Sequence, residues 1–437
     1  MGKKIGIVIC NFNKRDFIVN CIHSVFNSSI NDFEIYVVDN ASTDDSVKCI
    51  QKEFGNRIML LINRENLGGS GGFNTGIREA LKHGHKYIML MDNDIIVDKK
   101  AVEELYRFME QHHEVGIVGS KVYFMDYPKQ IWGYGGNIDW QQYLHRDQYK
   151  NCIDGVSIPE VSYCDYVAAC SLMTRTDAIR EVGLMPEENF IYWDDIEWGY
   201  RFNEAGYKVA VYGKSMIWHK AGGRNAGNTF IHYYMWRNRI RFFLKILSKE
   251  KKKQFAETIL KEMFQMIYSV NLKGETNIVK TLMYAFDDAV HGICGKAAEG
   301  KILPRPKVCN RLKLMLGEAE SVIIKFNGDM EGLGNIIRSI GNVSEKIKIS
   351  ITVQEQEKQK VAEQFVDSIV QTEYNPEMYD KHLIMCEHIF KLQDNMRQDN
   401  YIDSWCNIIY SEEDFTYAKS FKQTEKLFLL CKMGQIV

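Results

Sequence analysis

The stretch Tyr87-Ile-Met-Leu-Met-Asp92-Asn93-Asp94-Ile-Ile indicates both the fold of this chain and its first candidate site. Its apolar, branched residues predict a buried strand, which runs directly into two carboxylates one residue apart. Since side chains alternate along an extended chain, Asp92 and Asp94 can point the same way. Paired oxygen ligands suit a hard cation such as Mg²⁺ or Mn²⁺. The alternative is a polar turn after a strand.

Three further apolar runs lie upstream of this strand and alternate with helical patterns. They predict strands at 5–10, 34–39 and 58–62, with the first helix at 16–26. A β-α-β-α-β-α-β order predicts an α/β fold with a doubly wound, mostly parallel sheet. Open sheets of this kind bind ligands at the carboxyl ends of their strands, so a site is expected there.

A glycine-rich stretch, Asn66-Leu-Gly68-Gly69-Ser-Gly-Gly-Phe-Asn-Thr-Gly76, precedes the last of these helices. It predicts a loop whose backbone can approach a ligand closely and bind a phosphate or a sugar hydroxyl through its N–H groups. A flexible loop without a ligand is the alternative. The turn after the first strand lacks the glycines of a dinucleotide-binding fold, and no GxxxxGK phosphate loop occurs.

Composition describes an ordinary globular chain of 437 residues, enough for two to three domains. The net charge of -2 gives no reason to expect a nucleic-acid partner. Eleven cysteines without a CxxC pair, and no long apolar segment, favour a cytoplasmic location. An aromatic, basic helix near 232–247, followed by lysines up to Lys253, can also lie peripherally on the inner face of a membrane through residues 236–253. A packed helix with a solvated end is the alternative.

Together these motifs resemble the nucleotide-sugar half of a GT-A glycosyltransferase of family 2. The motifs that carry the resemblance are Val-Val-Asp39-Asn40-Ala-Ser-Thr-Asp44, Asn66-Leu-Gly-Gly and Asp92-Asn-Asp94. The glycine-rich form is similar to the galactofuranosyltransferase and rhamnosyltransferase branch. Downstream, Trp193-Asp194-Asp195-Ile-Glu197 matches the Trp-Asp-Asp-x-Glu form of galactofuranosyltransferases, and His219 fits the histidine that completes the metal site in that branch.

The resemblance implies a metal-dependent, inverting hexosyltransferase of the GT-A fold. Asp92, Asp94 and His219 would hold Mn²⁺ or Mg²⁺ against the donor diphosphate, and Asp195 would accept the proton of the attacking hydroxyl. The donor-binding residues that it implies are Asn13, Asp39, Asn40, Asp44, Asn66, Gly68, Gly69, Asp92 and Asn93. The acceptor-binding residues that it implies are Trp193, Asp194 and Glu197.

The implied donors are UDP-galactofuranose and dTDP-rhamnose, and the implied acceptor is a saccharide or a lipid-linked saccharide of cell-surface polysaccharide synthesis. An oligomer is compatible with this interpretation. Two alternatives stay open: a nucleotidyltransferase, which also uses paired acids and a metal, and a non-catalytic nucleotide-sugar-binding paralogue.

The remaining patterns predict the domain organisation. Further strands are expected at 166–173, 190–193, 207–212 and 216–219, and a donor-covering loop at 220–228. The predicted parts are a catalytic domain at 1–225 (nucleotide-sugar half 1–98, acceptor half 99–225), a helical extension at 226–303, a linker at 304–315 and a small α/β domain at 316–437. The last part repeats the opening strand-helix-strand pattern and contains Tyr410-Ser-Glu-Glu-Asp414, which is similar to a family 2 acidic motif. We therefore hypothesise a degenerate second GT-A half.

Overall fold

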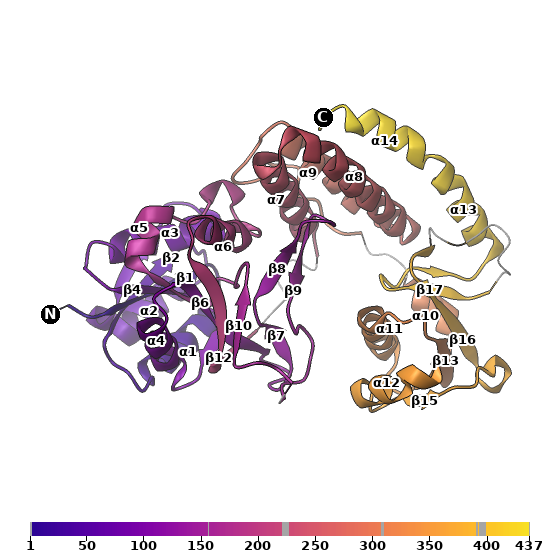
Figure 1. The fold of residues 1–437 in the computed structure, drawn as a ribbon, viewed down its shortest axis with the longest axis horizontal. Coiled ribbons are helices and arrows are strands. Elements are labelled where there is room, and N and C mark those ends of the chain that lie inside the picture. Colours follow the sequence, from indigo (N-terminus) through magenta and orange to yellow (C-terminus); the bar gives the residue numbers. More distant parts are fainter. Residues whose placement is uncertain are drawn as a thin grey trace. The chain divides into compact units, whose positions relative to one another are not determined.

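The computed structural model describes residues 2–155, 157–220, 227–306, 310–389, 392 and 399–436. The chain forms two compact units (Figure 1). The first contains Met1–Ser248 and Tyr284–Ile302, and the second contains Lys249–Met283 and Leu303–Val437. Every predicted site residue belongs to the first unit.

A ten-stranded sheet forms the centre of the first unit. Its strands are β1 (Ile5–Asn11), β2 (Phe33–Asp39), β3 (Met59–Ile62), β4 (Tyr87–Asp92), β5 (Ile95–Val97), β6 (Val115–Phe124), β7 (Ile131–Gly133), β10 (Val161–Cys164), β11 (Ser171–Arg175) and β12 (Lys208–His219). The main path is β10-β12-β6-β11-β4-β1-β2-β3, with β5 paired to β12 and β7 to β6. A separate hairpin joins β8 (Gly136–Asp139) and β9 (Leu144–Asp147).

Helices cover both faces of this sheet. One hydrophobic core contains residues of α1 (Arg15–Phe26), α2 (Ser46–Phe54) and α4 (Ala101–Gln111), and the other contains residues of α3 (Gly68–Ala80), α5 (Thr176–Val182) and α6 (Asp194–Glu204). Along β1, Ile7 and Ile9 face the first core while Val8 faces the second. Because both faces are buried, the strands are continuously apolar, and the predicted doubly wound α/β sheet is confirmed.

The parallel pairing of β1 with β2 and β4 places polar strand ends side by side. Asn11, the last residue of β1, pairs with Asp39, the last residue of β2. Asp92, the last residue of β4, pairs with Cys10. The predicted strands upstream of Asp92 therefore end at one edge of the sheet, as expected for a ligand site in an open α/β fold.

Three predicted elements differ from the structure. The sequence predicts a strand at 190–193, but these residues form a turn with positive φ angles at Phe190, Tyr192 and Trp193. The strand predicted at 166–173 begins only at Ser171. The strands predicted at 207–212 and 216–219 are one strand, β12, whose pairing with β6 shifts between Tyr212 and Met216. Hydrophobicity alone does not distinguish a strand from a buried turn or mark a bulge.

The glycine-rich stretch is also different, since its glycines lie inside α3 rather than in a loop before it. A Cβ atom on Gly76 would lie 2.2 Å from Val8 Cγ1, and one on Gly72 would lie 2.4 Å from Cys10 Sγ. Gly68 has a φ of 79°. Glycine is therefore required at 72 and 76, because α3 packs directly on β1 there, and it is favoured at 68 by the positive φ angle.

The second unit has its own six-stranded sheet. Its strands are β13 (Ser321–Lys325), β14 (Lys348–Thr352), β15 (Ile369–Gln371), β16 (Lys381–Cys386), β17 (Tyr401–Asp403) and β18 (Ile408–Ile409). The order is β15-β14-β13-β16-β17-β18, and the first four strands are parallel. This part repeats the parallel order β3-β2-β1-β4 of the first unit.

The remaining helices are α7 (Phe230–Ile246), α8 (Lys249–Leu272), α9 (Thr276–Val290), α10 (Arg311–Leu316), α11 (Met330–Val343), α12 (Lys358–Gln364), α13 (Glu412–Gln423) and α14 (Glu425–Met433). Among the helices of the described residues, none is both long enough and apolar enough to span a bilayer.

The close packing of α3 on β1 can be tested with Gly76→Ala. Although alanine favours a helix, the new methyl group overlaps Val8, so we expect the free energy of unfolding to fall by about 1–3 kcal/mol. The control is Gly341→Ala in α11, where a Cβ atom would meet nothing within 4 Å. That variant should be neutral or more stable. Thermal unfolding checks both variants, Gly76→Ala in the transition of the first unit and Gly341→Ala in that of the second. An unchanged transition for Gly76→Ala would contradict the packing argument.

Candidate active site

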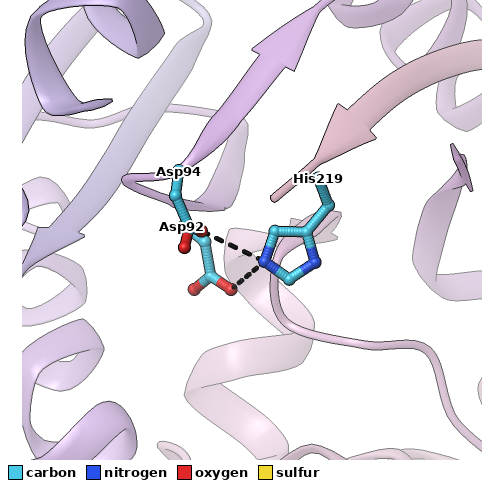
Figure 2. Close-up of side chains that lie close together, drawn as sticks. All are labelled: Asp92, Asp94 and His219. Atoms are coloured by element: carbon cyan, nitrogen blue, oxygen red, sulfur yellow. Dashed lines mark hydrogen bonds and ion pairs between the residues drawn. The ribbon is translucent and has the colours of Figure 1, made fainter. Parts of the chain in front are cut away.

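Three metal-ligand side chains converge at the carboxyl edge of the sheet: Asp92, Asp94 and His219 (Figure 2). His219 Nε2 lies 3.1 Å from Asp94 Oδ1 and 3.6 Å from Asp92 Oδ2. One ligand atom from each residue lies within 4.8 Å of the other two. Two carboxylate oxygens and one imidazole nitrogen at this spacing fit a divalent cation.

Strand pairing explains how His219 reaches the two aspartates. The chain turns after Asp92 and enters β5, which pairs antiparallel with the end of β12 so that Ile95 faces His219. The Lys220 backbone N–H donates to the Asp94 carbonyl oxygen at 3.0 Å. The Trp132 ring meets the imidazole edge-on, with ring centroids 4.7 Å apart. The backbone and this ring therefore fix where the histidine lies.

The two aspartates of this cluster differ in electrostatic environment. Burial raises the pKa of Asp92 to about 6, although the nearby His219 opposes the shift. Burial also acts to raise the pKa of Asp94, but hydrogen bonds and charges from His219 and Lys14 outweigh it and hold that pKa below its usual value. Lys14 Nζ lies 2.6 Å from Asp94 Oδ2. Positive charge therefore stabilises the ionised cluster.

A buried hydrogen-bond chain connects the ends of β1, β2 and β4. Asn11 Nδ2 donates to Asp39 Oδ1 at 3.0 Å, and Asn93 Nδ2 donates to Asn11 Oδ1 at 2.7 Å. The Ser42 N–H donates to the other Asp39 oxygen at 2.9 Å. Asn11, which is fully buried, thus links Asp39 to Asn93, the residue between the two aspartates of the candidate metal cluster.

Two other predicted donor residues, Asn13 and Asp44, hold neighbouring loops together. Asn13 Oδ1 accepts from the backbone N–H groups of Thr43 at 2.7 Å and Asp44 at 3.2 Å. Asp44 Oδ2 accepts from the Arg15 N–H at 3.1 Å. These contacts join the loop after β1 to the loop after β2, and both loops flank Asp39.

Asn40 and Asn66 fix the start of α3. Asn40 Nδ2 donates to the Gly68 carbonyl at 2.8 Å and to Asn66 Oδ1 at 3.1 Å. Asn66 Oδ1 also accepts from the Gly68 N–H at 2.8 Å. Gly69 follows, and a Cβ atom there would lie 3.6 Å from Asp194 Oδ2. The structure thus brings the start of α3 next to the first acid of α6.

The acidic pair opens α6. Burial, followed by the charge of Asp194, raises the pKa of Asp195 to about 8. Burial also raises the pKa of Asp194 to about 6. The Asp195 carboxylate accepts from the Ile196 N–H at 2.8 Å. Burial raises the pKa of the Cys170 thiol, and electrostatic interaction with Asp92, Asp195 and Asp94 raises it further.

Trp193 and Glu197 are both covered by protein. The Trp193 ring is 1% exposed, and its centroid lies 5.6 Å from that of His145 and 5.4 Å from that of Phe242. It therefore packs on protein rings here and offers no open face to a sugar. The acceptor-binding role of this residue stays a prediction.

Glu197 is 4% exposed and takes part in an ion-pair cluster whose cationic side chains, Arg201 and Lys245, are themselves partly exposed. Its carboxylate accepts from Arg201 Nη2 at 2.6 Å, Lys245 Nζ at 2.9 Å and Asn189 Nδ2 at 3.1 Å. The Lys245 and Arg201 contacts lower its pKa against the effect of burial. The structure thus pairs this acid, one turn into α6, with side chains of the same unit.

The basic helix predicted near 232–247 is α7, and two of its three arginines are buried. Arg237 is fully buried and Arg239 is 8% exposed. The predicted membrane contact therefore depends on the exposed lysines between 249 and 253. Of the predicted donor-covering loop at 220–228, residues 221–226 lie outside the described part of the chain.

Sequence reasoning missed Asn11 and Lys14. Asn11 ends an apolar strand at the edge where acids end the neighbouring strands, so its position was a usable signal. Lys14 follows in the same turn and contacts Asp94 across 80 residues of sequence. Only the tertiary structure reveals that contact.

The cluster of possible metal ligands at the strand ends and the acid pair of α6 agree with the site that the resemblance to family 2 glycosyltransferases implies. Two family models match the chain accordingly. Glycosyl transferase family 2 matches residues 6–165, and glycosyl transferase family group 2 matches residues 87–273.

Curated relatives carry the same kind of name. The chain is 21% identical over 310 residues to an uncharacterized glycosyltransferase of Haemophilus influenzae, covering 65% of this chain and 92% of that protein. It is 25% identical over 195 residues to galactofuranosyltransferase GlfT2 of Mycolicibacterium smegmatis, covering 41% of this chain and 30% of that protein. A crystal structure of GalNAc-T7 with UDP, GalNAc and Mn²⁺ is 14% identical, with a TM-score of 0.45, covering 58% of this chain and 49% of that chain.

The part of the chain that holds the site therefore belongs to glycosyltransferase family 2, and the protein is a glycosyltransferase of GT-A fold. This assignment favours glycosyl transfer over the nucleotidyl-transfer alternative.

The raised pKa of Asp195 makes stability depend on pH. The pKa of Asp195 in the folded protein, about 8, lies above the value of about 3.9 for an unfolded aspartate. Between these two values the folded state holds a proton that the unfolded state has lost, so stability falls as the pH rises from about 4 to about 8 and levels off above 8. An asparagine side chain at this position holds no such proton, so the Tm of Asp195→Asn relative to the unsubstituted protein should be higher at pH 9 than at pH 5. The exposed control Asp16→Asn should show equal differences at both pH values, and equal differences for Asp195→Asn would contradict the argument.

Proposed function

We propose that this protein is a metal-dependent, inverting glycosyltransferase that transfers a hexose from a nucleotide diphosphate sugar to a saccharide hydroxyl. The observation that carries the proposal is the cluster of Asp92, Asp94 and His219 at the strand ends of a family 2 domain. The Cys170 thiol interacts electrostatically both with the aspartates of this cluster and with Asp195 of α6.

The metal site would be formed by Asp92, Asp94 and His219. A divalent cation bound there supplies Lewis-acid stabilisation of the diphosphate leaving group. A nitrogen ligand beside two carboxylates favours Mn²⁺ over Mg²⁺. Lys14 adds a fixed positive charge at Asp94.

Asp195 would act as the general base. Its carboxylate takes the proton of the acceptor hydroxyl while that oxygen forms a bond to the anomeric carbon. The bond between this carbon and the donor phosphate oxygen breaks on the opposite face, and the electron pair leaves with the nucleotide diphosphate. One displacement inverts the anomeric configuration. The raised pKa of Asp195, about 8, gives the base a higher proton affinity than an exposed aspartate has.

On the donor side, we assign Asp39 to the nucleoside base, because Asn11 and the Ser42 N–H hold its carboxylate in one orientation. Galactofuranose and rhamnose are the proposed sugars. The similarity to a galactofuranosyltransferase and the Trp-Asp-Asp-Ile-Glu sequence at 193–197 support the first of these. We propose a saccharide acceptor, free or lipid-linked, in cell-surface polysaccharide synthesis.

For residues 316–437 of the second unit, we propose a degenerate GT-A half used in packing, oligomerisation or acceptor docking. Its parallel strand order supports this. Its acidic motif supports it too, because Asp414 serves the fold: Ser411 is the N-cap of α13, and the Asp414 carboxylate accepts from the Ser411 N–H and forms an ion pair with Arg311.

Metal-dependent donor binding can be measured by thermal unfolding with UDP, dTDP, GDP and CDP, each with and without Mn²⁺. A ligand at 100 times its Kd stabilises by about 2.7 kcal/mol, a shift of a few degrees. We expect a Mn²⁺-dependent shift with UDP or dTDP that His219→Ala strongly reduces. An equal shift without Mn²⁺, or in His219→Ala, would exclude this metal site.

The assignment of the base is tested by Asp195→Asn. This variant should lose about 10²–10⁴-fold in transfer rate, because it cannot accept the proton, while its Mn²⁺-dependent nucleotide binding is retained. Asp16→Asn, an exposed substitution on α1, should transfer normally. In the unsubstituted protein the rate should rise with pH up to about 8 as Asp195 ionises. Normal transfer by Asp195→Asn would show that another group is the base.

A further inference from the structure

The turn that delivers the acid pair has an unusual backbone. Phe190, Tyr192 and Trp193 have φ angles of 65°, 63° and 64°. Side chains other than glycine rarely adopt this region, and each such residue costs about 1–3 kcal/mol unless its surroundings hold it there. Trp193 directly precedes Asp194, so the conformation of the turn sets where α6 begins.

A single side chain on α7 contacts most of this turn. Asn238 Nδ2 lies 2.8 Å from the Asn189 carbonyl oxygen and 2.9 Å from those of Ile191 and Tyr192. Asn238 is fully buried. Three carbonyl groups of a tight turn thus share one amide group, and without it they would be buried with fewer donors.

Arg237, the preceding residue, fixes the orientation of that amide. Its Nε donates to Asn238 Oδ1 at 2.9 Å, which turns Asn238 Nδ2 toward the carbonyls. Its Nη2 donates to the Asn189 carbonyl at 3.0 Å, and its Nη1 donates to the Gly295 carbonyl at 2.7 Å. The guanidinium is fully buried, with its carbon 4.9 Å from the centroid of the Tyr234 ring.

The start of α3 contacts the remaining carbonyl of the turn. Ser70 Oγ lies 3.4 Å from the Phe190 carbonyl oxygen, and a Cβ atom on Gly68 would lie 2.0 Å from it. The turn is therefore held between α3, which also lies beside Asp194, and the Arg237-Asn238 pair of α7.

We propose that Arg237 and Asn238 are positioning residues that hold this left-handed turn and thereby place the carboxylates of Asp194 and Asp195 for catalysis. The catalytic consequence rests on the proposed function. A displacement of about 1 Å in a reacting group can lower a rate about 10²-fold, so loosening the turn should act on the chemical step rather than on donor binding.

The test compares Asn238→Ala and Arg237→Lys with a matched control, Arg175→Lys. Arg175 is also a buried arginine that donates to backbone carbonyls, including Val115 at 2.8 Å and His112 at 2.8 Å. It lies at the other end of the sheet, where β6 and β11 meet. Arg237→Lys retains the charge but removes the Nε contact that orients Asn238. If Asn238→Ala does not fold, Arg237→Lys alone tests the proposal.

Two readouts are taken on the full chain. In hydrogen-exchange mass spectrometry, Asn238→Ala and Arg237→Lys should speed exchange in peptides covering 189–196, and Arg175→Lys should not. For hydrolysis of UDP-galactofuranose and dTDP-rhamnose with Mn²⁺, kcat should fall about 10²-fold in the first two variants. The donor KM and the calorimetric Kd for UDP with Mn²⁺ should stay within about twofold.

Unchanged exchange at 189–196, or a kcat no lower than that of Arg175→Lys, would overturn the proposal. If the unsubstituted protein hydrolysed neither donor, the proposed function and the catalytic part of this inference would fail for that pair of sugars. The exchange result would still decide whether Arg237 and Asn238 hold the turn, so the two failures are distinguishable.

Discussion

The antiparallel pairing of β5 with the end of β12 is the constraint on which the candidate metal site depends. It brings His219 to Asp94 across 125 residues of sequence. β12 pairs with β6 both before and after a register shift between Tyr212 and Met216, and only the segment after this shift also pairs with β5. Buried Ser215 lies in that irregular segment, and its hydroxyl contacts Ser120 Oγ at 2.7 Å and the Ala101 carbonyl at 3.0 Å. A slip by one residue would turn the histidine to the other face of the sheet.

The site concentrates negative charge on carboxylates that differ in exposure: Asp94 and Asp194 are 8% exposed, whereas the Asp92 side chain is 37% exposed. Asp92, Asp194 and Asp195 all have pKa values raised first by burial, and the two acids of α6 also repel each other. Such a cluster destabilises the folded chain unless positive charge is nearby. Lys14 and His219 supply some, and the first N–H groups of α6 face the acid pair. Stability is thus lost at the place where a cation and an acceptor proton would be bound.

The first half of the fold was predictable because its strands are continuous apolar runs and the acids directly follow them. The turn at 190–193 was not, since its aromatic residues look like a strand, whereas its left-handed angles depend on Asn238, 46 residues beyond Tyr192. The glycines of α3 could be found but not interpreted, because their role is contact with β1 and with Phe190. Among the site residues, Asp92, Asp94 and His219 were predicted from their residue types and positions at strand ends, and the structure brings them together. Asn11 was overlooked although its strand-end position was a signal, while the contact of Lys14 with Asp94 required the spatial arrangement.

The second unit separates the requirements of the fold from those of the chemistry. β13 ends at Lys325 opposite Thr352, in the positions where β1 and β2 end at Asn11 and Asp39. β16 ends at Cys386 where β4 ends at Asp92. The parallel order of four strands is the same in both units, so apolar strands and covering helices suffice to specify it. Asn11, Asp39 and Asp92 are therefore not required by this topology, and their presence at the strand ends of the first unit supports the ligand-binding roles that we propose for that edge of the sheet.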